Sequence, residues 1–204
     1  MITIIDYGMG NLGSIVNTLR RIGVSGKVTS DSNDVRTADK IILPGVGSFN
    51  KGMENLKSAG LVPALEEQVL ENDVPILGIC LGMQLFSDRS EEGDARGLGW
   101  IKADTVRFHF ESNGSRLKIP HMGWNSVIST EDPLLANVTP DDRFYFVHSY
   151  HIAQIEEELV IGTTLYGYEF PSVIRQGTIY GIQCHPERSH SSGIRVLKNF
   201  MDLH

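Results

Sequence analysis

Short apolar segments alternate with helical patterns through the first 90 residues, and this alternation limits the folds open to the chain. The apolar segments, which read as strands, are residues 2–5, 40–43 and 74–79. The helical patterns, in which apolar side chains recur at every third or fourth position, are residues 11–22, 61–70 and 81–86. Strands that alternate with helices predict a parallel sheet with helices on both of its faces.

The second half of the chain has a different pattern, with more strands and few helices between them. The strand-like segments are residues 124–128, 143–147, 159–165, 172–175 and 178–183. Gln176 and Gly177 stand between the last two segments and predict a hairpin turn, and residues 193–203 have helical spacing. We therefore expect one α/β domain over residues 1–204. Its sheet should be mostly parallel and doubly wound, with additional antiparallel strands in the second half.

Composition excludes several classes of function. The chain has 204 residues and a formal net charge of −7, with no basic run, so nucleic acid and anionic membranes are poor partners. Its apolar runs are far shorter than the roughly 20 residues that cross a bilayer. The N-terminal residues lack the pattern of a signal peptide. We expect a cytoplasmic protein whose two cysteines, Cys80 and Cys184, stay reduced.

A glycine motif near the N-terminus suggests one function. Gly8–Gly13 fits the pattern G-x-G-x-x-G between a strand and a helix, and Asp31 follows at about the spacing of a ribose-binding acid. The alternative is a tight turn, for which glycine is widely used. A dinucleotide site needs two mononucleotide-binding halves, and the second half of the chain does not resemble one. A non-catalytic dinucleotide-binding module through Gly8–Gly13 remains the remote alternative.

Cys80 lies in a pattern that suits a nucleophile. Residues 78–82 read Gly-Ile-Cys-Leu-Gly, the form in which a sharp strand-to-helix turn exposes the central residue. The start of the following helix favours a thiolate, and the N–H group of Leu81 could face an oxyanion formed by attack. The alternative is a small buried residue at the end of a strand.

A thiol nucleophile needs a base, and His185 is the best candidate among the seven histidines. It ends an apolar strand, and Pro186 keeps it out of helical geometry. Residues two apart in extended chain face the same way, so Glu187 can reach the imidazole and fix its tautomer. A lone histidine at a strand end is more often structural. A further glycine turn at residues 44–47 follows another strand, where it could offer N–H groups to an oxyanion.

Three segments together resemble the class I, or triad-type, glutamine amidotransferases. They are Pro-Gly-Val-Gly at residues 44–47, Gly-Ile-Cys-Leu-Gly-Met-Gln at 78–84 and His-Pro-Glu at 185–187. Three more are similar to the glutaminase subunits of imidazole glycerol phosphate synthases. They are Asp-Tyr-Gly-Met-Gly-Asn at residues 6–11, Pro-His-Met-Gly-Trp-Asn at 120–125 and Tyr-Phe-Val-His-Ser-Tyr at 145–150. The resemblance covers essentially the whole chain.

The resemblance implies a glutaminase reaction without a metal or an organic cofactor. Cys80 attacks L-glutamine to form a thioester, His185 transfers protons and Glu187 holds His185. The oxyanion and substrate residues that it implies are Gly45, Val46, Gly47, Leu81, Gln84, Ser149 and Tyr150. Ammonia then passes to a (β/α)8 cyclase subunit, with which the chain forms a heterodimer. That cyclase makes imidazole glycerol phosphate in histidine biosynthesis.

The resemblance also implies a face for the partner and the exit of ammonia. It assigns Asn11, Met122, Trp124 and Arg188 to this face, and it makes the loop around Gly8–Asn11 part of the same face. For Trp124 the alternative is a place in the buried core.

Two departures from the family's pattern bear on the partner. Cys184 replaces the usual Phe before the catalytic histidine and could be an oxidation risk beside the site. Arg188 stands where Lys is frequent. The Cys184 departure and the Ser-His-Ser-Ser stretch at residues 189–192 leave an alternative open. The same glutaminase chemistry could feed a different synthase, such as one in bacterial surface-sugar amination.

Overall fold

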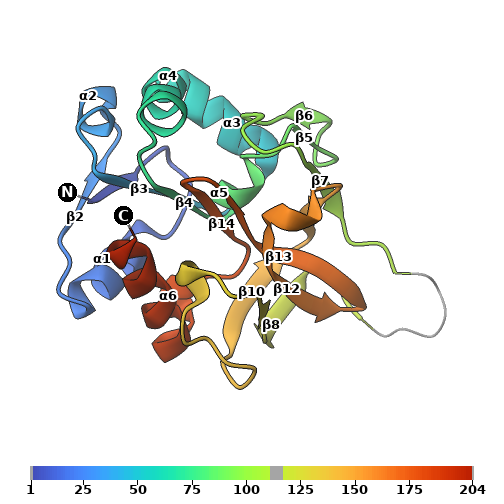
Figure 1. Cartoon of the computed structure of the whole chain (residues 1–204). Coiled ribbons are helices and arrows are strands. Elements are labelled where there is room, and N and C mark those ends of the chain that lie inside the picture. Colours follow the sequence, from blue (N-terminus) through green and yellow to red (C-terminus); the bar gives the residue numbers. More distant parts are fainter. Residues whose placement is uncertain (1, 111–116, 204) are drawn as a thin grey trace.

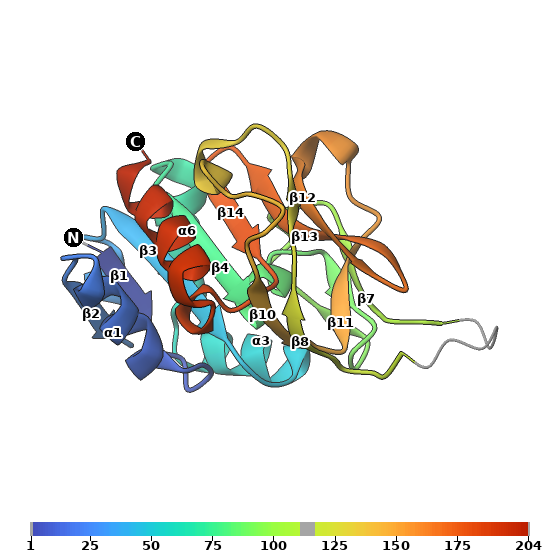
Figure 2. The same ribbon diagram turned by 90° about the horizontal axis from the view of Figure 1, so that it is seen from below.

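The computed structural model describes residues 2–110 and 117–203. One mixed sheet of eight strands runs through the molecule in the order β2-β1-β3-β4-β14-β13-β12-β9 (Figures 1 and 2). These strands are, in that order, Gly26–Thr29, Ile2–Ile5, Lys40–Gly45, Ile76–Cys80, Ile179–Ile182, Tyr168–Gln176, Val160–Tyr166 and Ile128–Ser129. The first five are parallel to one another, and the last three pair in antiparallel fashion. The mixed α/β fold predicted from the sequence is confirmed.

Helices cover both faces of the parallel half and create two apolar cores (Figure 1). One core lies under α2, α3, α4 and α5, which span Ser32–Val35, Phe49–Ser58, Val62–Glu66 and Leu81–Gln84. The other core lies under α1 and α6, which span Leu12–Arg21 and His190–Asp202. Strands of the parallel half are buried on both faces, as β4 is at all five of its residues. Such strands read as continuous apolar runs, which is why the sequence revealed them.

Two small sheets pack beside the antiparallel half. One pairs β8, His121–Asn125, with β10, Phe144–His148. The other has the order β11-β7-β5-β6, with strands Tyr150–Ala153, Asp104–Arg107, Arg89–Ser90 and Ala95–Arg96. Short 3-10 turns η2, η3 and η4 cover Pro133–Leu135, Glu157–Leu159 and Pro186–Arg188. None of the helices in the described residues is both long and apolar enough to cross a membrane.

Some predicted elements differ from the structure. The strand expected at residues 124–128 is divided, because β8 ends at Asn125 and β9 begins at Ile128. The Asn125 amide accepts from the N–H of Ser126 and donates to the carbonyl of Leu165, and this turns the chain. The helix expected at residues 61–70 is α4 followed by a π-helical turn η1, Glu67–Glu71. The sequence reading also missed β2, α2, α3, β5, β6, β7 and β11.

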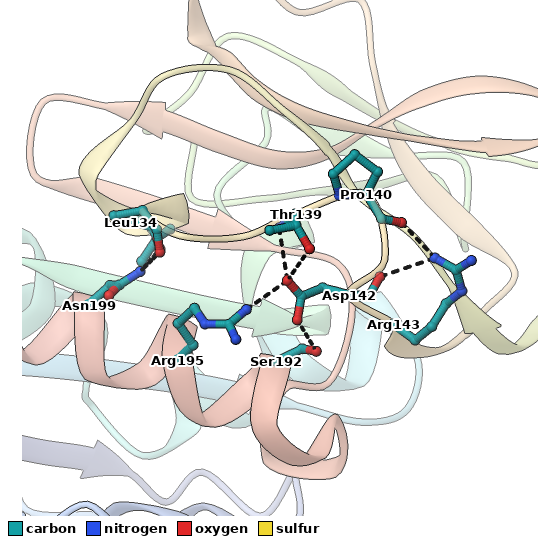
Figure 3. A network of polar contacts seen from close by, with 9 residues as sticks. Leu134, Thr139, Pro140, Asp142, Arg143, Ser192, Arg195 and Asn199 are labelled. Carbon is teal, nitrogen blue, oxygen red and sulfur yellow. Dashed lines mark hydrogen bonds and ion pairs between the residues drawn. The ribbon is translucent and has the colours of Figure 1, made fainter.

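A partly buried carboxylate fixes the loop that precedes β10 to the start of α6. Asp142 accepts hydrogen bonds from the N–H and hydroxyl of Thr139, from the Ser192 hydroxyl and from the Arg195 guanidinium (Figure 3). Burial opposes the charge of Asp142. The hydrogen bonds from Ser192, Thr139 and Arg195 outweigh it and lower the carboxyl pKa to about 2. The charged form of Asp142 therefore stabilises the fold.

Asp142→Asn should lower the free energy of unfolding at pH 7 by about 2 kcal/mol, because the folded chain holds this carboxylate far more strongly than the unfolded chain. The stabilisation is present above the ordinary carboxyl pKa of about 4 and is lost as the pH falls towards 2. Urea unfolding of both chains between pH 7 and pH 2 measures the difference. Asp141→Asn is the matched control, since Asp141 is exposed. A difference that is the same at pH 7 and pH 2 contradicts the assignment.

Candidate active site

Cys80 ends β4 and begins the turn into α5, as the sequence predicts. Its backbone has φ 54° and ψ −107°, a left-handed conformation that side chains other than glycine rarely adopt. A Cβ at Gly82 would lie 1.9 Å from the Leu43 carbonyl oxygen, and one at Gly78 would lie 2.7 Å from backbone atoms of Gly82 and Met83. The two flanking glycines therefore allow α5 to pack directly against β3 and β4.

The glycine turn after β3 lies beside the nucleophile. Gly45 pairs in register with Cys80, and a Cβ on it would lie 2.7 Å from the Leu81 Cβ. Gly47 has φ 127°, while Val46 between the two glycines is half exposed. The structure thus places Gly45, Val46 and Gly47 next to Cys80 and Leu81, where the sequence reading expected an oxyanion site.

His185 and Glu187 form a buried ion pair directly after β14. The His185 Nδ1 atom lies 2.8 Å from the Glu187 Oε1 atom, and the side chains are 3% and 2% exposed. Burial opposes charge on His185, but the Cys80 sulfur and the Glu187 carboxylate outweigh it and raise the imidazole pKa to about 10. His185 is therefore held as a buried imidazolium at neutral pH.

A hollow of about 250 Å³ opens over Cys80. Six further residues expected from the sequence line it, namely Val46, Gly47, Leu81, Gln84, Ser149 and Tyr150. Four others were not expected, and these are Glu92, Pro120, Val147 and His148. Glu92 is held by accepting the N–H of Phe49 at the start of α3. Pro120, Val147 and His148 lie in two of the segments that resemble the family, whereas Glu92 lies in none of the six segments.

The Gln84 side chain is more deeply buried than a residue that binds substrate directly would need to be. Its residue is 5% exposed, and its amide nitrogen donates to the Tyr150 carbonyl at 2.9 Å and to the Gln183 amide oxygen at 3.0 Å. Both hydrogens of this amide are therefore engaged within the protein.

Cys184 is fully buried in the bend between β14 and His185. Burial, together with the charges of Glu187 and Cys80, raises the pKa of its thiol well above the ordinary value. Oxidation requires an accessible thiolate. The expectation that Cys184 is an oxidation risk is therefore wrong for the folded chain.

Strand β8 lies next to β10 (Figure 2) and carries two exposed apolar side chains. Met122 is 63% exposed and Trp124 is 47% exposed, so the alternative of a buried Trp124 is wrong. The Trp124 ring stacks on His190 at a centroid distance of 5.1 Å, and Arg188 lies 4.6 Å above the ring of Tyr145. We name Met122, Trp124, Tyr145, Arg188 and His190 the β8 surface.

The Gly8–Gly13 loop packs against the glycine turn after β3 and leads into α1. A Cβ at Gly10 would lie 3.2 Å from Pro44, so the loop packs against the glycine turn after β3. Asn11 caps α1 by accepting the N–H of Ser14, and α1 packs against η4, which carries Arg188. Asp31, the candidate ribose ligand, instead caps α2 by accepting the N–H of Asn33.

Metal ligands do not cluster in the part of the chain that the structure describes. Across residues 2–110 and 117–203, no group of three or more His, Cys, Asp or Glu side chains could hold a metal ion.

Solved structures share this fold. A structure described as a glutamine amidotransferase superposes with a TM-score of 0.76 at 16% identity, covering 99% of this chain and 98% of the other. A structure described as PurLQS from Thermotoga maritima gives a TM-score of 0.72 at 18% identity, covering 98% of this chain and 97% of the other. At this identity the likeness establishes the fold alone.

Sequence comparison establishes the family. The family "Glutamine amidotransferase class-I" matches residues 3–203, and the chain belongs to it. Among the similar relatives is the imidazole glycerol phosphate synthase subunit HisH 2 of Methanococcus maripaludis, 48% identical over 98% of both chains. The HisH 2 subunit of Pseudomonas aeruginosa is 44% identical over the whole of both chains. The HisH subunit of Sulfurimonas denitrificans is 46% identical over 98% of this chain and 97% of its own.

The two thiols should differ sharply in reactivity. In the folded chain, iodoacetamide should modify Cys80 at least about 100-fold faster than Cys184, because only Cys80 lines a hollow and faces an imidazolium. Peptide mass spectrometry over a time course measures both rates. Cys184→Ala and Cys80→Ser chains report each thiol separately, and unfolding in urea should make the rates similar. Equal rates in the folded chain contradict the assigned environments.

Proposed function

We propose that this chain is the glutaminase subunit of an imidazole glycerol phosphate synthase and supplies ammonia for histidine biosynthesis. One observation carries the chemistry. Cys80, strained at the end of β4, lines a hollow and faces a buried imidazole whose far nitrogen is held by a carboxylate. Such an arrangement suits acyl transfer through a thioester. Membership of the amidotransferase family and full-length similarity to HisH subunits support the assignment.

The reaction follows from the positions of these groups. The Cys80 thiolate attacks the side-chain amide carbon of L-glutamine, and the carbonyl oxygen becomes an oxyanion. The Leu81 N–H and the turn at residues 45–47 lie nearest to this oxygen and stabilise it. His185 gives its proton to the nitrogen of this tetrahedral intermediate, the C–N bond breaks, and ammonia departs to leave a thioester. His185 then takes a proton from water, which attacks the thioester and releases glutamate.

The hollow offers complementary groups for the amino-acid end of glutamine. The Glu92 carboxylate lines it and matches the α-ammonium group, while the backbone at Ser149 and Tyr150 closes one side. Gln84 acts indirectly in this proposal, because its amide hydrogens already bond Tyr150 and Gln183. The hollow needs no metal or organic cofactor for this chemistry.

The β8 surface is the proposed contact with the synthase partner, a (β/α)8 cyclase in a heterodimer. An exposed Trp and Met flanked by Arg has the composition of an interface centre. Asn11, Met122, Trp124 and Arg188 were the residues expected there. α1, which Asn11 caps, packs against η4, which carries Arg188. A cytoplasmic location fits an enzyme that passes ammonia to a biosynthetic partner.

One observation favours an alternative in which this subunit serves a different synthase. Methanococcus maripaludis has two matching relatives, named HisH 2 and HisH 1, at 48% and 44% identity. Two such subunits in one organism leave room for one to serve a different synthase, such as one that aminates surface sugars. The glutaminase chemistry is the same in both cases.

Cys80→Ser should reduce glutamine hydrolysis by at least about 1000-fold in the complex, because the thiolate is lost while the fold is kept. Capture of partners from the native extract with the tagged chain, followed by mass spectrometry, provides the complex and identifies the synthase. The variant should capture the same partner in equal amount. A (β/α)8 cyclase supports histidine biosynthesis, and a sugar-modifying synthase supports the second candidate. Hydrolysis that survives the substitution overturns the glutaminase assignment.

Trp124→Ala should weaken binding of the synthase partner by at least about 30-fold, because a buried Trp at an interface centre typically contributes about 2 kcal/mol. Titration calorimetry with the purified partner measures this. Leu70→Ala is the matched control, since Leu70 is equally exposed but lies on η1, away from β8. An unchanged dissociation constant for Trp124→Ala removes the β8 surface from the interface.

A further inference from the structure

A buried amide joins the nucleophile to the substrate hollow. The Gln183 amide nitrogen lies 3.6 Å from the Cys80 sulfur, and its amide oxygen accepts from Gln84 at 3.0 Å. Gln84 in turn donates to the Tyr150 carbonyl at 2.9 Å. Gln183 is fully buried on the chain segment that leads from β14 to His185. A buried amide is costly unless it is hydrogen-bonded, so these bonds fix its position.

One group that can only accept hydrogen bonds determines how the Gln84 and Gln183 amides are oriented. The Tyr150 carbonyl has no hydrogen to donate, so Gln84 must present its nitrogen to it. The second hydrogen of that nitrogen then goes to the Gln183 oxygen, which leaves the Gln183 nitrogen facing sulfur. An N–H group directed at sulfur favours the thiolate over the thiol.

Two histidines fix the Tyr150 carbonyl from the other side. His148 Nδ1 lies 2.7 Å from this carbonyl and must therefore carry a hydrogen. His148 Nε2 is then an acceptor, so the His121 Nδ1 atom 3.0 Å away donates to it. His121 Nε2 accepts from the Asn125 amide at 3.3 Å.

The imidazoles of His121 and His148 are both neutral in this row of hydrogen bonds. Burial lowers the pKa of His121 to about 4. Burial also lowers the pKa of His148, which the charge of His185 lowers further. Because neither ring changes its charge near neutral pH, the direction of the chain is constant from Asn125 on β8 to the sulfur.

We propose that Gln183 is a positioning residue for the nucleophile, held in one orientation by the hydrogen-bonded chain from Asn125 through His121, His148, Tyr150 and Gln84. The Gln183 amide then directs an N–H group at the Cys80 sulfur, in addition to the positive charge that His185 places near it. The helix that follows Cys80 has only four residues, so a side-chain donor adds to what its N-terminus supplies. The catalytic consequence rests on the proposed glutaminase function, whereas the thiol chemistry does not.

The test is the rate of Cys80 alkylation by iodoacetamide as a function of pH, measured on the isolated chain without glutamine. Gln183→Leu should reduce the fraction of Cys80 present as thiolate by about tenfold at any pH below the midpoint of the rate profile. The midpoint itself should therefore rise by about one pH unit. Gln183→Asn keeps an amide but withdraws it from sulfur, so it should move the midpoint in the same direction. This shorter variant serves if Gln183→Leu does not fold.

The matched control is Ser172→Ala. Ser172 is equally buried, and its carbonyl accepts the backbone N–H of Gln183, but its hydroxyl lies outside the chain of amides. This variant should leave the midpoint unchanged even if it lowers the melting temperature. A midpoint that does not move in folded Gln183→Leu or Gln183→Asn overturns the proposal, as does an equal movement in Ser172→Ala.

Activity in the complex separates this proposal from the proposed function. Gln183→Leu should lower kcat for glutamine about tenfold and change KM by less than about threefold, because it alters the nucleophile and not the substrate contacts. If the unaltered complex hydrolyses no glutamine while the alkylation midpoint still moves, the glutaminase function fails and the positioning role stands. If the complex is active and the midpoint does not move, the positioning role fails alone.

Discussion

The contact between Gly82 and the Leu43 carbonyl is the constraint on which the site depends. A Cβ at residue 82 would overlap that oxygen, so only glycine lets α5 approach β3 so closely. In the sharp turn that brings α5 back onto β3, Cys80 has a positive φ, and the pairing of β3 with β4 sets it opposite Gly45. The nucleophile and the turn that faces it are thus positioned by backbone packing. Side chains from the second half of the chain then complete the site.

The His185 imidazolium can be buried because it lies beside the Glu187 carboxylate and near the Cys80 sulfur. The cost of desolvation is offset by the Cys80–His185 and His185–Glu187 pairs, and the net effect on His185 is a strongly raised pKa. The neutral His121 and His148 avoid adding a second positive charge within the same region. The arrangement separates one charged triad from one neutral hydrogen-bonded chain, and both end at the same sulfur.

The parts of the site that local sequence encodes were predictable, and the parts that depend on distant pairing were not. The glycines around Cys80 and the Pro between His185 and Glu187 act on neighbouring backbone, so their geometry follows from the sequence. Gln183 and Glu92 carry no such local signal, because their partners lie on other strands. The fully buried strands of the parallel half were also predicted from the sequence, because they form continuous apolar runs. The short strands β5, β6 and β7 were not, since two or four residues give too little periodicity.

The hydroxyls at the start of α6 bear on how freely this chain could diverge towards another partner. Ser189 accepts from the Tyr145 N–H and donates to the His185 carbonyl, and Ser192 donates to Asp142. Ser189 and Ser192, half of the stretch at residues 189–192, therefore hold His185, β10 and the loop before β10 in place. Only His190 and Ser191 are exposed there. Substitutions at these two positions would therefore change the surface next to Trp124 on β8 without removing the hydrogen bonds that hold His185.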